Sequence, residues 1–122
     1  EAYKMPAETE KQRAEKEEVM EERLLAASFV PMEIMDKALR VLEILECLEE
    51  KGSRMAVSDV GVAVQFARAA LTGAVMNVYI NTRSMKNQER AKALNEKAGQ
   101  VVEEGIRKAD GIYEKVQKSL KL

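Results

Sequence analysis

Hydrophobic residues recur along most of the chain at the three- and four-residue spacing of amphipathic helices, and the longest apolar stretch runs from Val57 to Arg83. This stretch is too long for a strand and contains no proline. Ser58 is a good N-cap residue, and Asp59 follows in the first turn, where a negative charge is favourable. We therefore predict one helix over Val57–Arg83, around which the rest of the chain is organised.

Winding this segment at about 100° per residue sorts its side chains onto three faces. The apolar face consists of Val60, Val64, Leu71, Val75 and Val78. The face expected to meet water or a polar cleft consists of Gln65, Arg68, Thr72, Tyr79 and Arg83. The third face combines small residues with polar groups: Asp59, Ala63, Phe66, Ala70, Gly73, Asn77 and Asn81.

The third face allows two explanations. In the structural one, both asparagines bond to a neighbouring helix, because an unpaired buried amide costs about 1–3 kcal/mol, while Gly61 and Gly73 permit close helix crossing. Asp59 would then only stabilise the start of the helix. Spacing alone favours this explanation. The functional alternative gains support because Asp59 is the only carboxylate between Lys51 and Met85.

The chain before this segment predicts one or two further helices. Thr9 and Gln12 have the spacing of a capping box, so a helix should begin near Glu10. Pro31 either kinks one long helix or opens a second one, and the pattern leaves both open. Gly52 should end the helix. Beyond the proline, the expected core positions are Ile34, Ala38, Val41, Leu45 and Leu48.

After Arg83, residues 84–87 form a predicted break, and helical spacing returns from Gln88 to Leu120. Three glycines in this last segment can mark bends or close contacts: Gly99, Gly105 and Gly111. With 122 residues, 4 % aromatic residues and only two prolines, we expect a single all-α domain over residues 1–122, a multihelical bundle of long and short helices.

The charge balance argues against nucleic acid as a partner. The 20 basic and 21 acidic residues nearly cancel, so no global field attracts nucleic acid or an anionic membrane. Residues 1–50 carry most of the acidic charge, and an anionic small molecule would more plausibly meet the later two-thirds of the chain. We see no signal peptide and no apolar run long enough to span a bilayer, and we expect a soluble protein.

The absence of histidine excludes an imidazole base and the commonest transition-metal ligand. Any catalysis must use carboxylate, amine, hydroxyl or amide groups. Cys47 is the only cysteine and lies among leucines, so we predict a buried, reduced thiol and no intrachain disulfide.

Specific residues suggest a family. The segment GSRMAVSDVGVAVQFARAALTGAVMNVYINTRSMKN, with the opening EAYKMPAETE and Val30-Pro31, resembles the cyclodeaminase domain of formiminotransferase-cyclodeaminase and its stand-alone bacterial relatives, the methenyltetrahydrofolate cyclohydrolases. The likeness runs from Glu1 to about Asn87. Its most specific parts are the Ser-Asp pair at positions 58 and 59 and the sequence NVYIN at positions 77–81.

This resemblance implies a multihelical homodimer with a folate cleft lined by helix ends and polar groups, acting in cytoplasmic one-carbon metabolism. The reaction would be hydrolysis of methenyltetrahydrofolate to formyltetrahydrofolate, which the free-standing size favours. The alternative is cyclisation of formiminotetrahydrofolate with release of ammonia, and no residue decides between them. The resemblance implies no metal or redox cofactor, only a tetrahydrofolate derivative as substrate.

Two departures from the family pattern are visible. Family members have about two additional N-terminal helices with a glycine-rich stretch, so we expect the domain in residues 1–122 to lack its N-terminal helices. The turn before the Ser-Asp pair usually has an asparagine-proline character, whereas Ser53-Arg54-Met55 stands here.

The resemblance also suggests roles for individual residues. Asp59 would transfer protons, and Ser58, Asn77 and Asn81 would bind the substrate, provided that helical winding brings the aspartate and the two amides into a shared hollow. Candidates for contact with the glutamate tail are Lys4, Arg54, Arg83 and Lys86. The rival hypothesis is a non-enzymatic helical dimerisation module, which uses the acidic first helix and the long last helix as interaction surfaces and binds no folate.

Overall fold

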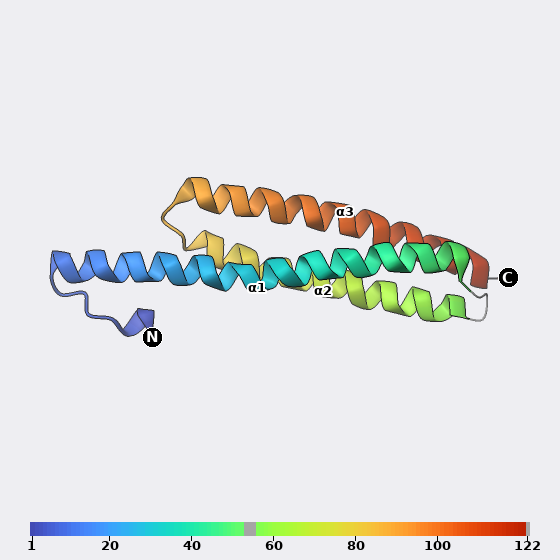
Figure 1. The fold of residues 1–122 in the computed structure, drawn as a ribbon, viewed down its shortest axis with the longest axis horizontal. Coiled ribbons are helices and arrows are strands. Elements are labelled where there is room, and N and C mark those ends of the chain that lie inside the picture. Colours follow the sequence, from blue (N-terminus) through green and yellow to red (C-terminus); the bar gives the residue numbers. More distant parts are fainter. Residues whose placement is uncertain (53–55, 122) are drawn as a thin grey trace.

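Three long helices and one short 3-10 helix account for most of residues 1–52 and 56–121, which the computed structural model describes. The 3-10 helix η1 spans Ala2–Lys4, and the α-helices are α1 (Glu10–Lys51), α2 (Val57–Arg83) and α3 (Gln88–Leu120). α2 runs back along α1, and α3 packs against both, so the helices form an elongated bundle (Figure 1). The predicted all-α class is confirmed.

α1 begins and ends where its sequence signals stand. The Thr9 hydroxyl accepts a hydrogen bond from the Gln12 amide at 3.1 Å, and the Gln12 side chain accepts one from the Thr9 amide at 3.2 Å, which completes the predicted capping box. Gly52 is the C-cap residue, as predicted. Pro31 lies inside α1 and does not divide it, so the alternative of two separate helices is excluded.

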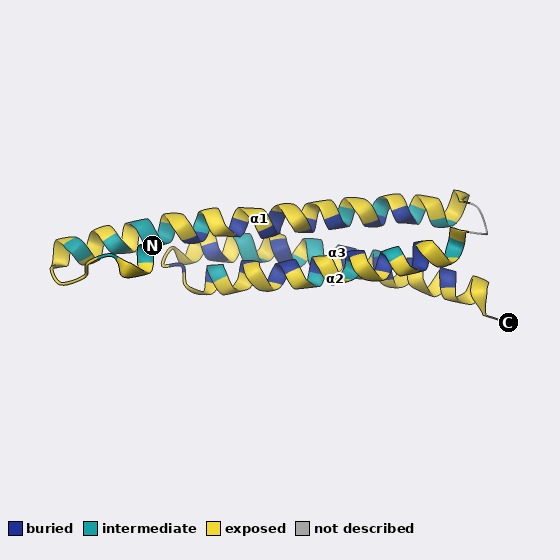
Figure 2. Ribbon diagram, turned by 90° about the horizontal axis from the view of Figure 1, so that it is seen from below, coloured by how far each residue is buried: buried dark blue, intermediate teal, exposed yellow. Residues whose placement is uncertain are grey.

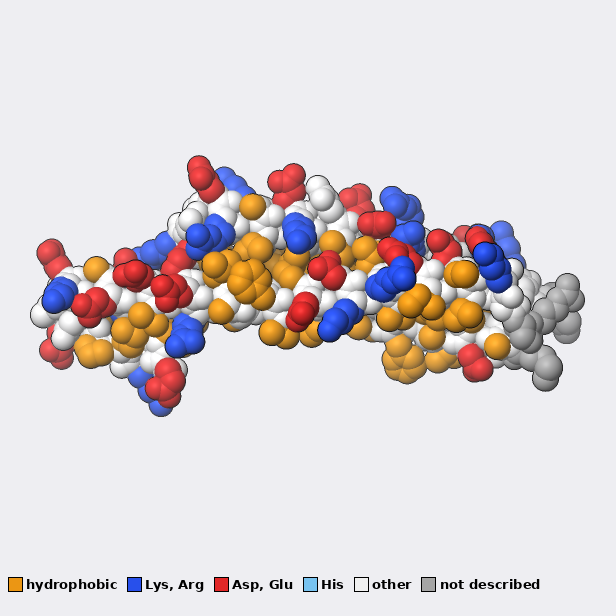
Figure 3. Space-filling model, viewed as in Figure 1, with side chains coloured by type: hydrophobic (Ala, Val, Ile, Leu, Met, Phe, Trp, Pro, Cys, Tyr) orange, Lys and Arg blue, Asp and Glu red, His pale blue; other side chains and the backbone are white. Residues whose placement is uncertain are grey.

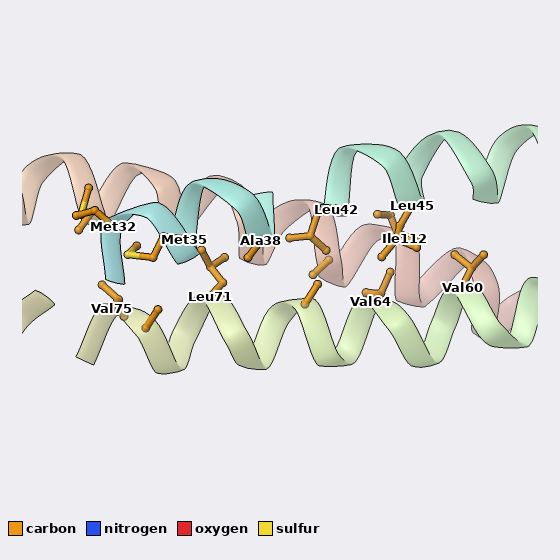
Figure 4. Close-up of a cluster of buried hydrophobic side chains, with 14 of the residues drawn as sticks. Met32, Met35, Ala38, Leu42, Leu45, Val60, Val64, Leu71, Val75 and Ile112 are labelled. Carbon is orange, nitrogen blue, oxygen red and sulfur yellow. The ribbon is translucent and has the colours of Figure 1, made fainter. Parts of the chain in front are cut away.

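One stripe of each helix forms the common core. The predicted apolar face of α2 is buried along its whole length, with Val64, Leu71 and Val78 fully enclosed. Figure 2 marks the buried positions of the helices in dark blue, and Figure 4 shows Val64, Leu71 and Val75 within the cluster of buried side chains. α1 contributes Met35 and Leu42 to the same layer. The main core is therefore a continuous apolar layer along the bundle axis, which fixes the rotation of α2 and decides which of its side chains face outward.

Gly105 marks the closest approach between helices. A methyl group built on Gly105 would lie 2.1 Å from Leu71 Cδ2 and 3.6 Å from Leu42 Cδ1. The backbone of α3 packs this close to Leu71 because residue 105 has no side chain. The sequence predicts either bends or close contacts at the glycines of the last helix, and the structure shows a close contact at Gly105. Gly111 has no other group within 4 Å of such a methyl.

Two predictions for α1 are wrong. Burial follows Met35, Ala38, Leu42 and Leu45, whereas three predicted core positions remain exposed: Ile34, Val41 and Leu48. Cys47 is also exposed rather than buried. The cause is that the hydrophobic side chains of α1 occupy a wider arc of its surface than α2 and α3 can cover. Spacing alone does not tell which stripe of such an arc packs inward.

The connection from α2 to α3 is held by α1. Glu21 accepts hydrogen bonds from the backbone amides of Lys86 at 2.7 Å and Asn87 at 2.9 Å. Beneath this connection lies a second apolar cluster of Leu24, Met85 and Ala91. The first turns of α1 extend beyond this point, past the ends of α2 and α3, with η1 beside them (Figure 1).

Candidate functional site

The Ser-Asp pair lies in the first turn of α2. The helix begins at Val57 with Ala56 as its N-cap residue and no side-chain cap, so the prediction that Ser58 caps the helix is wrong. Asp59 does stand in the first turn, as predicted. Both side chains are exposed. The pair is therefore open to solvent at one end of the bundle rather than enclosed by it.

Beside this pair, a groove of about 690 Å³ runs between the first half of α2 and the end of α3. Its walls are Ser58, Gly61, Val62, Gln65, Phe66 and Ala69 on α2, and Tyr113, Val116, Gln117, Leu120 and Lys121 at the end of the chain. The surface is mostly apolar, with a few polar groups among the walls. This volume and this composition are typical of small-molecule sites.

Gly61 brings the two walls of the groove together. A methyl group built there would lie 2.9 Å from Val116 Cγ1, so α3 packs tightly against this turn of α2. The structural explanation for Gly61, close helix crossing, is thus confirmed. The polar groups that sequence reasoning assigned no role are Tyr113 and Gln117 on α3. Their spacing of one helical turn is a signal, but the family motifs that carry the resemblance lie before this helix.

The two predicted amides lie at the opposite end of α2. Asp59 and Asn77 are 18 residues apart, which separates them by about 27 Å along the helix axis. Within one protomer they therefore share a face but no hollow, and that part of the prediction is wrong. Helical winding aligns residues on a face, whereas the rise of the helix keeps them apart.

The two asparagines also differ from each other. The Asn81 side-chain amide donates a hydrogen bond to the Ala27 carbonyl of α1 at 3.2 Å, which confirms the structural explanation for this residue. Asn77 is exposed. Gly73, on the same face, has nothing within 4 Å of a built methyl group, so the proposed close helix crossing at this glycine is absent among the described residues.

The predicted cations are dispersed. Lys4 is exposed in η1, and Arg83 is exposed in the last turn of α2. Lys86 forms an ion pair with Glu17 of α1, so its charge is already compensated. Arg54 lies outside the described residues.

The connection after α2 also affects an acidic residue of α1. The backbone amides of Lys86 and Asn87 hold the pKa of Glu21 below its ordinary value.

Residues 1–52 and 56–121 contain no group of three acidic or cysteine side chains placed to hold a metal ion. Within the same ranges, none of the helices combines the length and the apolar character needed to cross a bilayer.

Comparison with known proteins identifies the class to which this helical bundle and its groove belong. The pattern of the formiminotransferase-cyclodeaminase family matches residues 1–100, and the chain belongs to this family. Over 117 residues it is 33 % identical to the methenyltetrahydrofolate cyclohydrolase of Methylorubrum extorquens. That alignment covers 95 % of this chain and 56 % of the relative, so the chain spans about half the length of the curated relative it matches.

Proposed function

We propose that the chain takes part in folate one-carbon interconversion, as the hydrolase that converts methenyltetrahydrofolate to formyltetrahydrofolate. The observation that carries this proposal is the 33 % identity to a cyclohydrolase over nearly the whole chain. The groove beside Ser58 supports it, since a flat ring system fits an apolar cleft with a few polar groups on its walls.

The chemistry needs a positioned proton acceptor. Water adds its oxygen to the carbon that bridges two folate nitrogens and gives up a proton. The tetrahedral carbon then breaks its bond to one nitrogen, and a second proton of the former water moves to that nitrogen. The net reaction consumes one water and releases one proton. Asp59, next to the groove residue Ser58, is the carboxylate proposed to move these protons, a contribution of about 10²- to 10⁴-fold.

The proposed binding residues fall into two groups. Ser58 lies at the groove and would hold a water or a polar edge of the ring. Asn77 lies at the far end of α2 together with Arg83, and Lys86 follows in the next connection. Because these two groups are so far apart along α2, we propose that the functional unit is a homodimer, in which residues from two copies can meet.

The test is an absorbance assay. Addition of the purified chain to methenyltetrahydrofolate should accelerate the loss of its absorbance above the spontaneous rate. Unchanged kinetics at every enzyme concentration would refute the proposed hydrolysis by this chain. The assay is run alongside the longer relative from Methylorubrum extorquens, which shows that the substrate and buffer support turnover.

The family description favours a second reaction, the cyclodeaminase step. In that case the attacking atom is a folate nitrogen and the leaving group is ammonia. Ammonia release from formiminotetrahydrofolate distinguishes this reaction from hydrolysis. A non-enzymatic dimerisation module would show neither activity, and calorimetry with a folate analogue would then detect no binding.

A further inference from the structure

α2 carries apolar side chains on the face that points away from the bundle. Four large residues are largely exposed there, Val62 at 57 %, Phe66 at 74 %, Met76 at 58 % and Ile80 at 56 %. Figure 3 shows part of this surface, where hydrophobic side chains gather along the lower right edge over the first half of α2. A helix that is apolar on both its inner and outer faces is typical of a buried position, and the described residues of this chain leave the outer face exposed.

The exposed residues have a regular spacing. From Val62 they follow intervals of four and three residues in alternation, and the small residues Ala69 and Gly73 complete the series between the large ones. This is the heptad spacing of helices that pack against each other along a seam. We call Val62, Phe66, Ala69, Gly73, Met76 and Ile80 the α2 seam.

No contact with another described residue of this chain explains Gly73. A glycine inside a helix costs stability relative to alanine, and nothing lies within 4 Å of a methyl built at this position. The absence of a side chain has a use only where another backbone approaches from outside. Gly73 lies at the middle of the seam, next to Ala69, where two helices would cross most closely.

We infer that the α2 seam packs against the α2 seam of a second copy, with the two helices antiparallel around a two-fold axis near Leu71. This register places Val62 opposite Ile80 of the second copy and Phe66 opposite Met76 of the second copy. Ala69 and Gly73 then face each other at the centre. The inference rests on the homodimer proposed above and specifies its interface. Such an interface is isologous, because the same patch serves both copies.

Charge complementarity selects the second copy as the occupant of the seam. The heptad spacing continues to Asp59 before the seam and to Arg83 after it, and neither forms an ion pair with another described residue of its own chain. In the antiparallel register Asp59 faces Arg83 of the second copy at both ends. A parallel register would instead place like charges together at each end.

The exposed apolar stripe of α1 does not offer the same match. Its heptad series Val30, Ile34, Val41, Ile44 and Leu48 is interrupted by Lys37, which stands near the middle. Self-pairing along α1 would bring two lysines into an apolar contact near the two-fold axis, where burial of a charge is costly. The observations therefore favour α2 over α1 as the surface between copies.

This pairing also changes the candidate site. Asp59 of one copy comes within about 10 Å, along the helix axis, of Asn77 of the second copy, instead of about 27 Å within its own chain. The groove between α2 and α3 shares Val62, Phe66 and Ala69 with the seam, so the second copy closes one side of it. This register thus brings the two groups of proposed folate residues closer together than they lie within one chain.

The first experiment compares the only two phenylalanines of the chain, both exposed. Sedimentation equilibrium of the full chain should give the mass of two copies. Phe66→Asp should weaken the dimer by at least about 30-fold, because a charge replaces a central apolar contact. Phe29→Asp on α1 should leave the dimer constant unchanged. Circular dichroism of both variants verifies that the helices are retained.

The second experiment determines the orientation. In a Cys47→Ser background, proteins carrying Val62→Cys or Ile80→Cys are oxidised alone and as a mixture. The antiparallel register predicts cross-linked heterodimers in the mixture and little cross-linking of either protein alone. The opposite result would establish a parallel register and overturn the inference.

The outcomes separate the inference from the proposed function. A monomeric wild-type chain would overturn both the dimer and the seam, and would leave the seam to a different occupant, such as the part of the longer relatives that this chain does not match. A dimer that persists unchanged in Phe66→Asp would overturn the seam alone. Neither measurement uses a folate, so the absence of turnover would refute the proposed reaction without affecting this result.

Discussion

The side-chain amide of Asn81 donates a hydrogen bond to the backbone carbonyl of Ala27, at a distance of 3.2 Å. Ala27 lies four residues before Pro31, and it therefore accepts no helical hydrogen bond from that residue, since proline has no N–H group. α2 thus supplies the donor that the proline removes from α1. This bond explains how α1 accommodates Pro31 without separating into two helices.

Asn81→Ala should lower the free energy of unfolding by about 1 kcal/mol, because the Ala27 carbonyl loses its donor. In a Pro31→Ala background the same substitution should cost less, since an alanine in place of the proline restores the helical N–H. Urea denaturation of the wild type, both single variants and the double variant gives the coupling energy. Equal costs in the two backgrounds would show that Asn81 does not compensate for the proline.

Gly105→Ala should destabilise the fold by about 1–3 kcal/mol, because the added methyl would overlap the buried Leu71 side chain. Gly111→Ala, six residues later in α3, is the matched control. It meets no other group and should stabilise the helix by about 0.5–1 kcal/mol. Thermal unfolding should therefore move in opposite directions for the two variants, and a rise at both positions would contradict the close approach at Gly105.

Glu21→Gln should destabilise the protein by about 1 kcal/mol at neutral pH, since a neutral amide is a weaker acceptor for the Lys86 and Asn87 amides. Because the pKa of Glu21 is lowered from its ordinary 4.5 in the fold, its contribution is present above pH 4.5 and is lost as the pH falls through the folded pKa.

The difference in stability between wild type and Glu21→Gln should therefore shrink in acid. Urea denaturation at a series of pH values measures it. Glu22→Gln, at an exposed neighbouring position, is the control for the substitution itself and should leave the stability at neutral pH unchanged. A difference that stays constant down to acid pH would mean that the Glu21 charge does not hold the connection.

Asp59→Asn should reduce hydrolysis of methenyltetrahydrofolate by about 10²- to 10⁴-fold, because the amide cannot take up a proton. The measurement is made at concentrations where the variant has the mass of a dimer, so that a change in assembly does not affect the rate. Asp36→Asn, at an exposed position of α1, serves as the control with unchanged turnover. Full activity of Asp59→Asn would exclude the proposed proton transfer.

Most of the fold could be predicted from the sequence, because its signals are local. The capping box at Thr9 and Gln12, the C-cap at Gly52 and the uninterrupted apolar face of α2 each depend on residues within a few turns of one another. The position of Asp59 in a first turn follows from the same kind of signal.

The candidate site could be predicted only in part, because it depends on distances and on neighbours. Periodicity placed Asp59 and Asn77 on one face but did not measure the separation between them. It also does not decide which stripe of α1 packs inward, and for this reason the predicted burial of Cys47 is wrong. The groove walls on α3, including Tyr113, arise from tertiary packing that no local pattern records.

The first turns of α1, which lie beyond the ends of α2 and α3, have a consequence for how the molecule opens. Residues 10–18 contain no buried side chain, and the apolar layers begin only further along the helix, with the first buried residue at Leu24. Fraying from this end sacrifices no tertiary contact of the core, so backbone amides here should exchange with deuterated solvent far faster than those around Leu42. Binding of a partner or ligand to these turns would be detected first as slower exchange of the backbone amides at this end of α1.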